Sequence, residues 1–135
     1  MARHGLIEFC DWLVASDWPL PEELGTDRTG PLDCVLTAGC TAPPAGDYRH
    51  HQQWWAADGS LSLEHHWNEG QEHLVRFPGQ ADCLIEATCR QARITIHPDL
   101  DQPELEQLLL HQVLPRMMSL RGRLVLHASA VLWDQ

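Results

Sequence analysis

The run Gln52-Gln-Trp-Trp-Ala-Ala57, followed by Asp58-Gly59 and then Ser60-Leu-Ser-Leu-Glu-His-His-Trp67, decides the fold class of this 135-residue chain. Two strand-like runs are joined by a two-residue Asp-Gly turn, whose residues favour the positive φ that a tight hairpin requires. In the second run apolar or aromatic positions alternate with polar ones, so one face is apolar and the other polar. The stretch predicts a β-hairpin.

Further strands are expected on both sides of this hairpin. Each is a short apolar run that ends at proline, glycine or a polar turn. The predicted strands cover residues 6–14, 33–40, 72–77, 82–88 and 92–97, and the last two form a second hairpin around Arg90-Gln91.

One helix is predicted after the strands. Asp101 is its expected N-cap, Pro103 lies in its first turn, and Glu104 stands three residues after the cap. One apolar stripe follows at helical spacing, formed by Leu105, Leu108, Leu109, Val113, Met117 and Leu120. Pro115 should kink this helix because it removes a backbone donor, and Gly122 should end it.

A final strand is expected over residues 123–133. The predicted fold is therefore α+β: a mostly antiparallel, β-rich single domain over residues 1–135, with one long C-terminal helix followed by a final strand. A chain of this length can bury a core without metal or disulfide cross-links.

Charge and composition limit the classes of partner that the chain can bind. Nine Arg against nineteen Asp and Glu give a net charge of −10, which disfavours nucleic acid and anionic membranes. The N-terminus lacks the apolar segment of a signal peptide, and no long apolar run follows. Five cysteines without a C-x-x-C pair suit reduced thiols. We therefore expect a cytoplasmic protein that binds neither nucleic acid nor membrane.

Several stretches resemble one known family. They are Leu13-Val-Ala-Ser-Asp-Trp-Pro-Leu-Pro-Glu22, Arg76-Phe-Pro-Gly79, Leu114-Pro115-Arg116 and Gly122-Arg-Leu-Val-Leu-His-Ala-Ser-Ala-Val131. Together they are similar to the N-terminal portion of HPr-kinase-related proteins. In that family the last of these strands leads to a glycine-rich phosphate-binding loop with a Lys and a Ser or Thr.

The resemblance implies a front portion that ends before the phosphate-binding loop. The chain has no G-x-x-x-x-G-K-[ST] motif and no lysine, so no group matches those that cradle phosphates and hold Mg²⁺ in such kinases. His127 corresponds to a histidine just before the loop, and Ser129 lies two residues further on. Both are expected to be vestigial rather than catalytic, and no cofactor is expected.

Histidines at 50, 51, 65, 66 and 73 raise the alternative of a metal site, with His51, His65 and His73 as candidate ligands. Adjacent histidines on a strand point to opposite faces, so each pair offers one ligand per face. None of the spacings matches a zinc-binding motif. Edge-strand or solvated histidines are the competing interpretation.

Tryptophans are the candidate interface residues. Those at 12, 54, 55 and 67 could form an aromatic platform, although core packing and cross-strand contacts are also expected uses. Exposed tryptophans anchor protein interfaces. The predicted interface set is Trp54, Trp55, Trp67 and Trp133.

Three functions remain open on the sequence. The first is a non-catalytic binding or regulatory module that meets a protein partner or a separate kinase domain. The second is the first segment of a split or truncated ATP-dependent serine kinase. The third is a small His-rich metal-binding protein.

Overall fold

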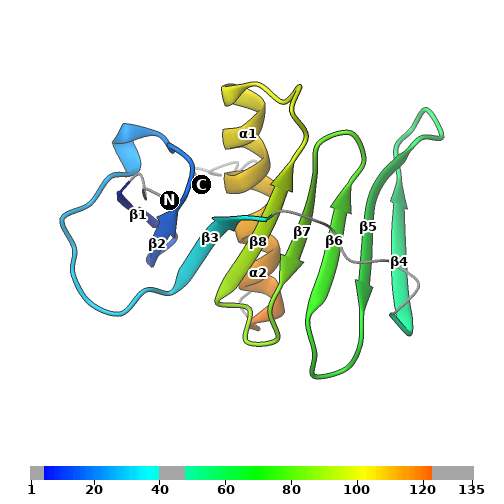
Figure 1. The fold of residues 1–135 in the computed structure, drawn as a ribbon, viewed down its shortest axis with the longest axis horizontal. Helices are drawn as coiled ribbons and strands as arrows, with labels where there is room; N and C mark the ends of the chain where they lie inside the picture. Colours follow the sequence, from blue (N-terminus) through cyan, green and yellow to red (C-terminus); the bar gives the residue numbers. More distant parts are fainter. Residues whose placement is uncertain (1–4, 40–47, 123–135) are drawn as a thin grey trace, which may run out of the picture.

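The computed structural model describes residues 5–39 and 48–122, and these residues form one mixed sheet with a helix on one face (Figure 1). The strand order across the sheet is β1-β2-β3-β8-β7-β6-β5-β4. The strands are β1 (Leu6–Phe9), β2 (Trp12–Ser16), β3 (Cys34–Ala38), β4 (His50–Trp55), β5 (Leu61–Trp67), β6 (His73–Phe77), β7 (Ala81–Ile85) and β8 (Gln91–Ile96). The predicted α+β, β-rich class is thus confirmed.

A continuous antiparallel meander, β4 to β8, makes up most of the sheet. The predicted hairpin over residues 52–67 is its first unit. Gly59 has φ +88°, and the Ala56 N–H donates to the Ser60 carbonyl at 2.8 Å. The predicted hairpin is confirmed, but its connection is longer than the expected two-residue Asp-Gly loop. The Gly59 N–H donates to the Ala56 carbonyl at 3.0 Å, so Ala57 and Asp58 are the central residues of the turn, and of these three residues only Gly59 has positive φ.

The strand predicted over residues 6–14 is wrong in one respect, because two strands occupy this stretch. β1 and β2 pair antiparallel around Cys10 and Asp11, whose φ angles are +49° and +69°. Two successive residues with positive φ are typical of a tight hairpin turn, which glycine or asparagine usually fills. The sequence carries neither residue here and so hides the turn.

Two parallel pairings lie at the centre of the sheet. β3 is parallel to both β2 and β8. Two carboxylates fasten β2 to β3: the Leu13 N–H donates to Asp33 Oδ2 at 2.8 Å, and the Ala38 N–H donates to Asp17 Oδ2 at 2.9 Å. β3 thereby joins the β1–β2 hairpin to the meander in one sheet.

The predicted helix is present and begins at the predicted cap. The Asp101 carboxylate accepts the Glu104 N–H at 2.8 Å. The helix runs through α1 (Gln102–Leu108), a π-helical segment η3 (Leu109–Val113) and α2 (Leu114–Leu120). Pro115 was expected to kink the helix. In the structure it lies in the first turn of α2, directly after the π-helical segment, where the backbone bonding pattern changes.

The helix and one face of the sheet share the hydrophobic core. Figure 1 looks onto the opposite face, with the helix passing behind β8. Cys34 Sγ of β3 lies 3.7 Å from Met117 Sδ of α2, and both residues are buried. The helix does not extend behind β4, so the β4–β5 end of this face carries polar as well as apolar side chains.

The predicted final strand, together with His127, Ser129 and Trp133, lies outside the described residues. Within residues 5–39 and 48–122, no helix is both long and apolar enough to cross a membrane.

Candidate functional site

The helix-side face of β4, β5 and β6 carries a group of histidines and tryptophans. Leu63 faces the core, so alternation along β5 places His65 and Trp67 on the same side of the sheet. Trp67 is the cross-strand neighbour of His50 on β4 and of His73 on β6. We call the residues His50, His65, Trp67 and His73 the histidine cluster.

The rings of this cluster are in contact. His65 Nε2 lies 2.9 Å from His73 Nδ1, and the His65 ring centre is 4.8 Å from that of Trp67. His50 stacks on the other side, 5.4 Å from Trp67, and its Nε2 lies 2.8 Å from Glu69 Oε1. The cluster therefore spans three strands through hydrogen bonds and ring packing.

Burial favours the neutral form of His65 and of His73. It lowers the pKa of His65 from 6.5 to about 4, and the neighbouring His73, Arg116 and His66 lower it further. Burial also lowers the pKa of His73. One ring nitrogen of the contact must donate and the other accept, so the geometry requires at least one unprotonated nitrogen.

The three histidines considered as candidate metal ligands, His51, His65 and His73, do not come together. His65 and His73 meet, but His51 faces the other side of the sheet, where its ring lies 6.0 Å from that of His66. The alternation of β4 explains the separation. Among the described residues no group of three His, Cys, Asp or Glu side chains is placed to hold a metal ion.

Next to the histidine cluster, a groove lies between the helix and the strands. Its volume is about 410 Å³. We call it the Arg116 groove. Its principal lining residues are Trp54, Phe77, Gln80, Gln107, Gln112 and Arg116. Arg116 lies in α2 and reaches back to the sheet, where its guanidinium carbon is 5.1 Å from the centre of the Trp54 ring.

Arg116 stands out electrostatically. Its Nε is buried and has no hydrogen-bond partner, and none of the ion pairs within residues 5–39 and 48–122 includes it. Burial lowers the pKa of its guanidinium below the usual value. The side chain nevertheless carries a full charge, because arginine does not deprotonate in proteins.

Three of the four tryptophans of the predicted interface set lie in the described residues, and they occupy different environments. Trp54 is half-buried and packs against the core and Arg116, and Trp67 is half-buried in the histidine cluster. Trp55, at a β-bulge in the edge strand β4, is 61% exposed. In the described part of the chain, no other large hydrophobic side chain is exposed in this way.

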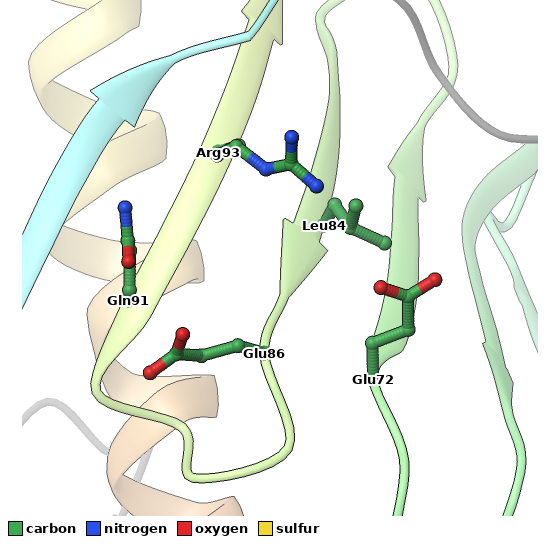
Figure 2. Close-up of a pocket in the computed structure, with 5 residues that line it drawn as sticks. All are labelled: Glu72, Leu84, Glu86, Gln91 and Arg93. Carbon is green, nitrogen blue, oxygen red and sulfur yellow. The ribbon is translucent and has the colours of Figure 1, made fainter.

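A second hollow lies on the face away from the helix (Figure 2). Its volume is about 350 Å³, and its lining residues are Glu72, Leu84, Glu86, Gln91 and Arg93. Figure 2 shows Arg93 of β8 extending toward Leu84, with Glu72 and Glu86 on either side of that leucine. Glu72 also accepts a hydrogen bond from the Tyr48 hydroxyl at 3.1 Å. Charges of both signs thus line this hollow, with two carboxylates and one guanidinium.

The three buried cysteines, Cys34, Cys83 and Cys89, are poor nucleophiles. Burial raises the pKa of Cys34 to about 12 and also raises the pKa of Cys83 and of Cys89. Cys34 and Cys83 have no exposed surface. Because the thiolate is the reactive form, these cysteines belong to the core.

Sequence reasoning did not single out Arg116 as a site residue. A signal was available, because Arg116 is the only Asp, Glu, Lys or Arg between Glu106 and Arg121, in the most apolar part of the helix. Its approach to Trp54, far earlier in the chain, could not be predicted from local pattern.

Comparison with protein-family models, with curated proteins and with solved structures finds no match to this chain.

Proposed function

We propose that this protein is a non-catalytic binding module that captures an extended segment of a partner protein along the outer edge of β4. The observation that carries the proposal is the exposure of Trp55, 61%, on the last strand of the sheet. An edge strand offers unpaired backbone groups to an added strand, and side-chain contacts then give specificity.

The two edges of the sheet differ in a way that favours β4. At the other edge, Ile7 of β1 forms a bridge with Gly25, and the Thr26 N–H donates to the Leu6 carbonyl at 3.3 Å. Among the described residues no comparable segment pairs with the outer edge of β4. A docking strand would therefore add to β4 rather than to β1.

The expected partner segment is extended, apolar where it meets Trp55, and neutral or basic overall. The apolar requirement follows from the burial of an exposed indole ring at an interface. The charge requirement follows from the net charge of −10, which repels an acidic partner. The resemblance to HPr-kinase-related proteins makes a separate kinase domain one partner of this kind.

Selection from a displayed library of random peptides tests the proposal. We expect peptides that bind the wild-type chain and the Trp55→Phe variant but lose at least about tenfold in affinity for Trp55→Ser. Hydrogen exchange followed by NMR should then show new protection of backbone amides in β4 when a selected peptide binds.

Three results would contradict the proposal. Peptides could bind Trp55→Ser as well as wild type, or they could protect amides at the β1 edge instead. Alternatively, analytical ultracentrifugation could show that the chain alone dimerises through Trp55, which would make a second copy the occupant of the edge.

A further inference from the structure

Arg116 is a partly buried cation that forms no ion pair with another described residue. Its Nε is buried and unpaired, and the guanidinium contacts the face of Trp54 at 5.1 Å. The aromatic face offsets part of the cost of burying the charge. A buried charge that lacks an ion pair remains unfavourable, so the site is electrostatically incomplete.

The groove beside Arg116 supplies neutral hydrogen-bond donors. Gln80 comes from the β6–β7 turn, and Gln107 and Gln112 come from the helix. Each amide carries an NH₂ donor. Among the described residues that line this groove there is no Asp or Glu, although the chain contains nineteen of them. The groove is thus a local exception to the acidic surface, and it suits an anion.

The remaining wall is apolar. Leu63, Phe77 and Leu108 line it with exposed fractions of 7%, 6% and 1%, and Trp54 closes one side. A ligand that fills about 410 Å³ would place an apolar body against these side chains.

We propose that the Arg116 groove binds the carboxylate of a ligand whose remaining body is uncharged and largely apolar. The planar guanidinium matches the two oxygens of a carboxylate. One arginine with neutral amides balances a single negative charge. A phosphate would bring up to two charges into a chain that already carries −10, and the described lining residues include no cation besides Arg116.

This site is independent of strand addition at β4, because the groove lies on the helix-side face and Trp55 is not among its lining residues. Two sources of the carboxylate are compatible with it. One is a small organic acid, and the other is the C-terminal carboxylate of a peptide that ends in an apolar residue.

Isothermal titration calorimetry on the full chain tests the proposal with four probes. The first pair is phenylpropionate and its neutral amide. The second pair is a short peptide ending in leucine with a free or an amidated C-terminus. We expect each acid to bind at least about tenfold more tightly than its matched amide, because a charge-assisted contact is lost. The tighter of the two acids identifies the source.

The matched variants are Arg116→Gln, Arg116→Lys and Arg121→Gln. Arg116→Gln should abolish the preference for acid over amide, and Arg116→Lys should retain part of it. Arg121 also stacks on a tryptophan, with its guanidinium carbon 4.5 Å from the Trp12 ring centre, but it has a partner in the Asp33 carbonyl. Arg121→Gln should therefore leave the preference for acid over amide unchanged, provided that circular dichroism shows this variant to be folded.

A measurement on wild-type protein keeps the proposal testable if a variant fails to fold. The Nε–Hε NMR signal of Arg116 should shift on titration with the acid and not with the amide. Equal binding of acid and amide, an unchanged preference in Arg116→Gln, or inorganic phosphate that shifts the same signal at lower concentration would each overturn the proposal.

Discussion

His65 Nε2 and His73 Nδ1 lie 2.9 Å apart on adjacent strands, and His65 is only 8% exposed. Two nitrogens at this distance cannot both carry a proton, so the contact depends on at least one neutral ring. Burial, together with His73, Arg116 and His66, lowers the pKa of His65 from 6.5 to about 4. The free energy of unfolding therefore depends on pH through this pair.

The first prediction concerns that coupling. Because the folded-state pKa of His65 is depressed, the unfolded chain binds more protons between about pH 6.5 and pH 4, and stability falls as the pH falls through this window. We expect His65 to account for a loss of about 2–3 kcal/mol in the free energy of unfolding. Urea unfolding at several pH values measures it.

His65→Gln is the variant that isolates this effect. The difference in stability between wild type and His65→Gln should shrink or reverse as the pH falls through the window, while the exposed His111→Gln should follow wild type throughout. A His65→Gln variant whose stability falls with pH as steeply as that of wild type would show that other groups carry the dependence.

The second prediction concerns the start of the helix. Asp101→Ala removes the acceptor of the Glu104 N–H, so the free energy of unfolding should fall by about 1 kcal/mol. Asp99→Ala, two residues earlier and exposed, is the control and should change stability by less than about 0.5 kcal/mol. Equal effects of the two substitutions in thermal or urea unfolding would argue against capping by Asp101.

The third prediction concerns the turn between β1 and β2. Asp11 has φ +69°, which costs a residue with a Cβ some strain that glycine avoids. Asp11→Gly should therefore stabilise the fold by about 0.5–1 kcal/mol. The backbone carbonyl of Asp11, which accepts from Arg28 Nη1 at 3.0 Å, is retained in the variant.

Gly59→Ala tests the same backbone strain in the opposite direction, because it adds a Cβ at a position with positive φ in a second hairpin turn. Gly59 has φ +88°, and an added methyl group would meet no neighbouring atom, so only backbone strain should act, at a cost of about 1 kcal/mol. If Asp11→Gly destabilised the protein in urea unfolding, the hairpin turn at Cys10 and Asp11 would be incorrect.

Local signals account for the parts of the fold that the sequence predicts well. The Asp58-Gly59 turn and the Asp101 cap each depend on residues within a few positions of one another. The parallel pairing of β3 with β2 and β8 depends instead on contacts between distant segments, which no short pattern encodes. The turn at Cys10 and Asp11 was missed because it contains no glycine or asparagine, and a single aspartate beside a cysteine does not mark a turn.

In the candidate site, too, some features follow from local sequence and others depend on contacts between distant segments. Alternation along β4 and β5 is local, and it already implies that His50 and His51 point to opposite faces. The meeting of His65 with His73 requires the register of β5 with β6, and the meeting of Arg116 with Trp54 requires the docking of the helix on the sheet. Both contacts follow from tertiary structure, so composition could suggest histidines and tryptophans but not which of them meet.

The fourth prediction compares two arginines that stack on tryptophans. Arg121 donates from Nη1 to the Asp33 carbonyl at 2.9 Å, whereas Arg116 has a buried Nε without a partner. Arg121→Met should lower the free energy of unfolding by about 1–2 kcal/mol, because a hydrogen bond and a cation–π contact are lost. Arg116→Met should stay within about 1 kcal/mol of wild type, because relief of an uncompensated buried charge offsets the lost contact with Trp54. Urea unfolding of both variants at neutral pH measures the difference. A larger loss from Arg116→Met than from Arg121→Met would mean that Arg116 is held for stability, and the case for a missing anionic ligand would lose its electrostatic basis.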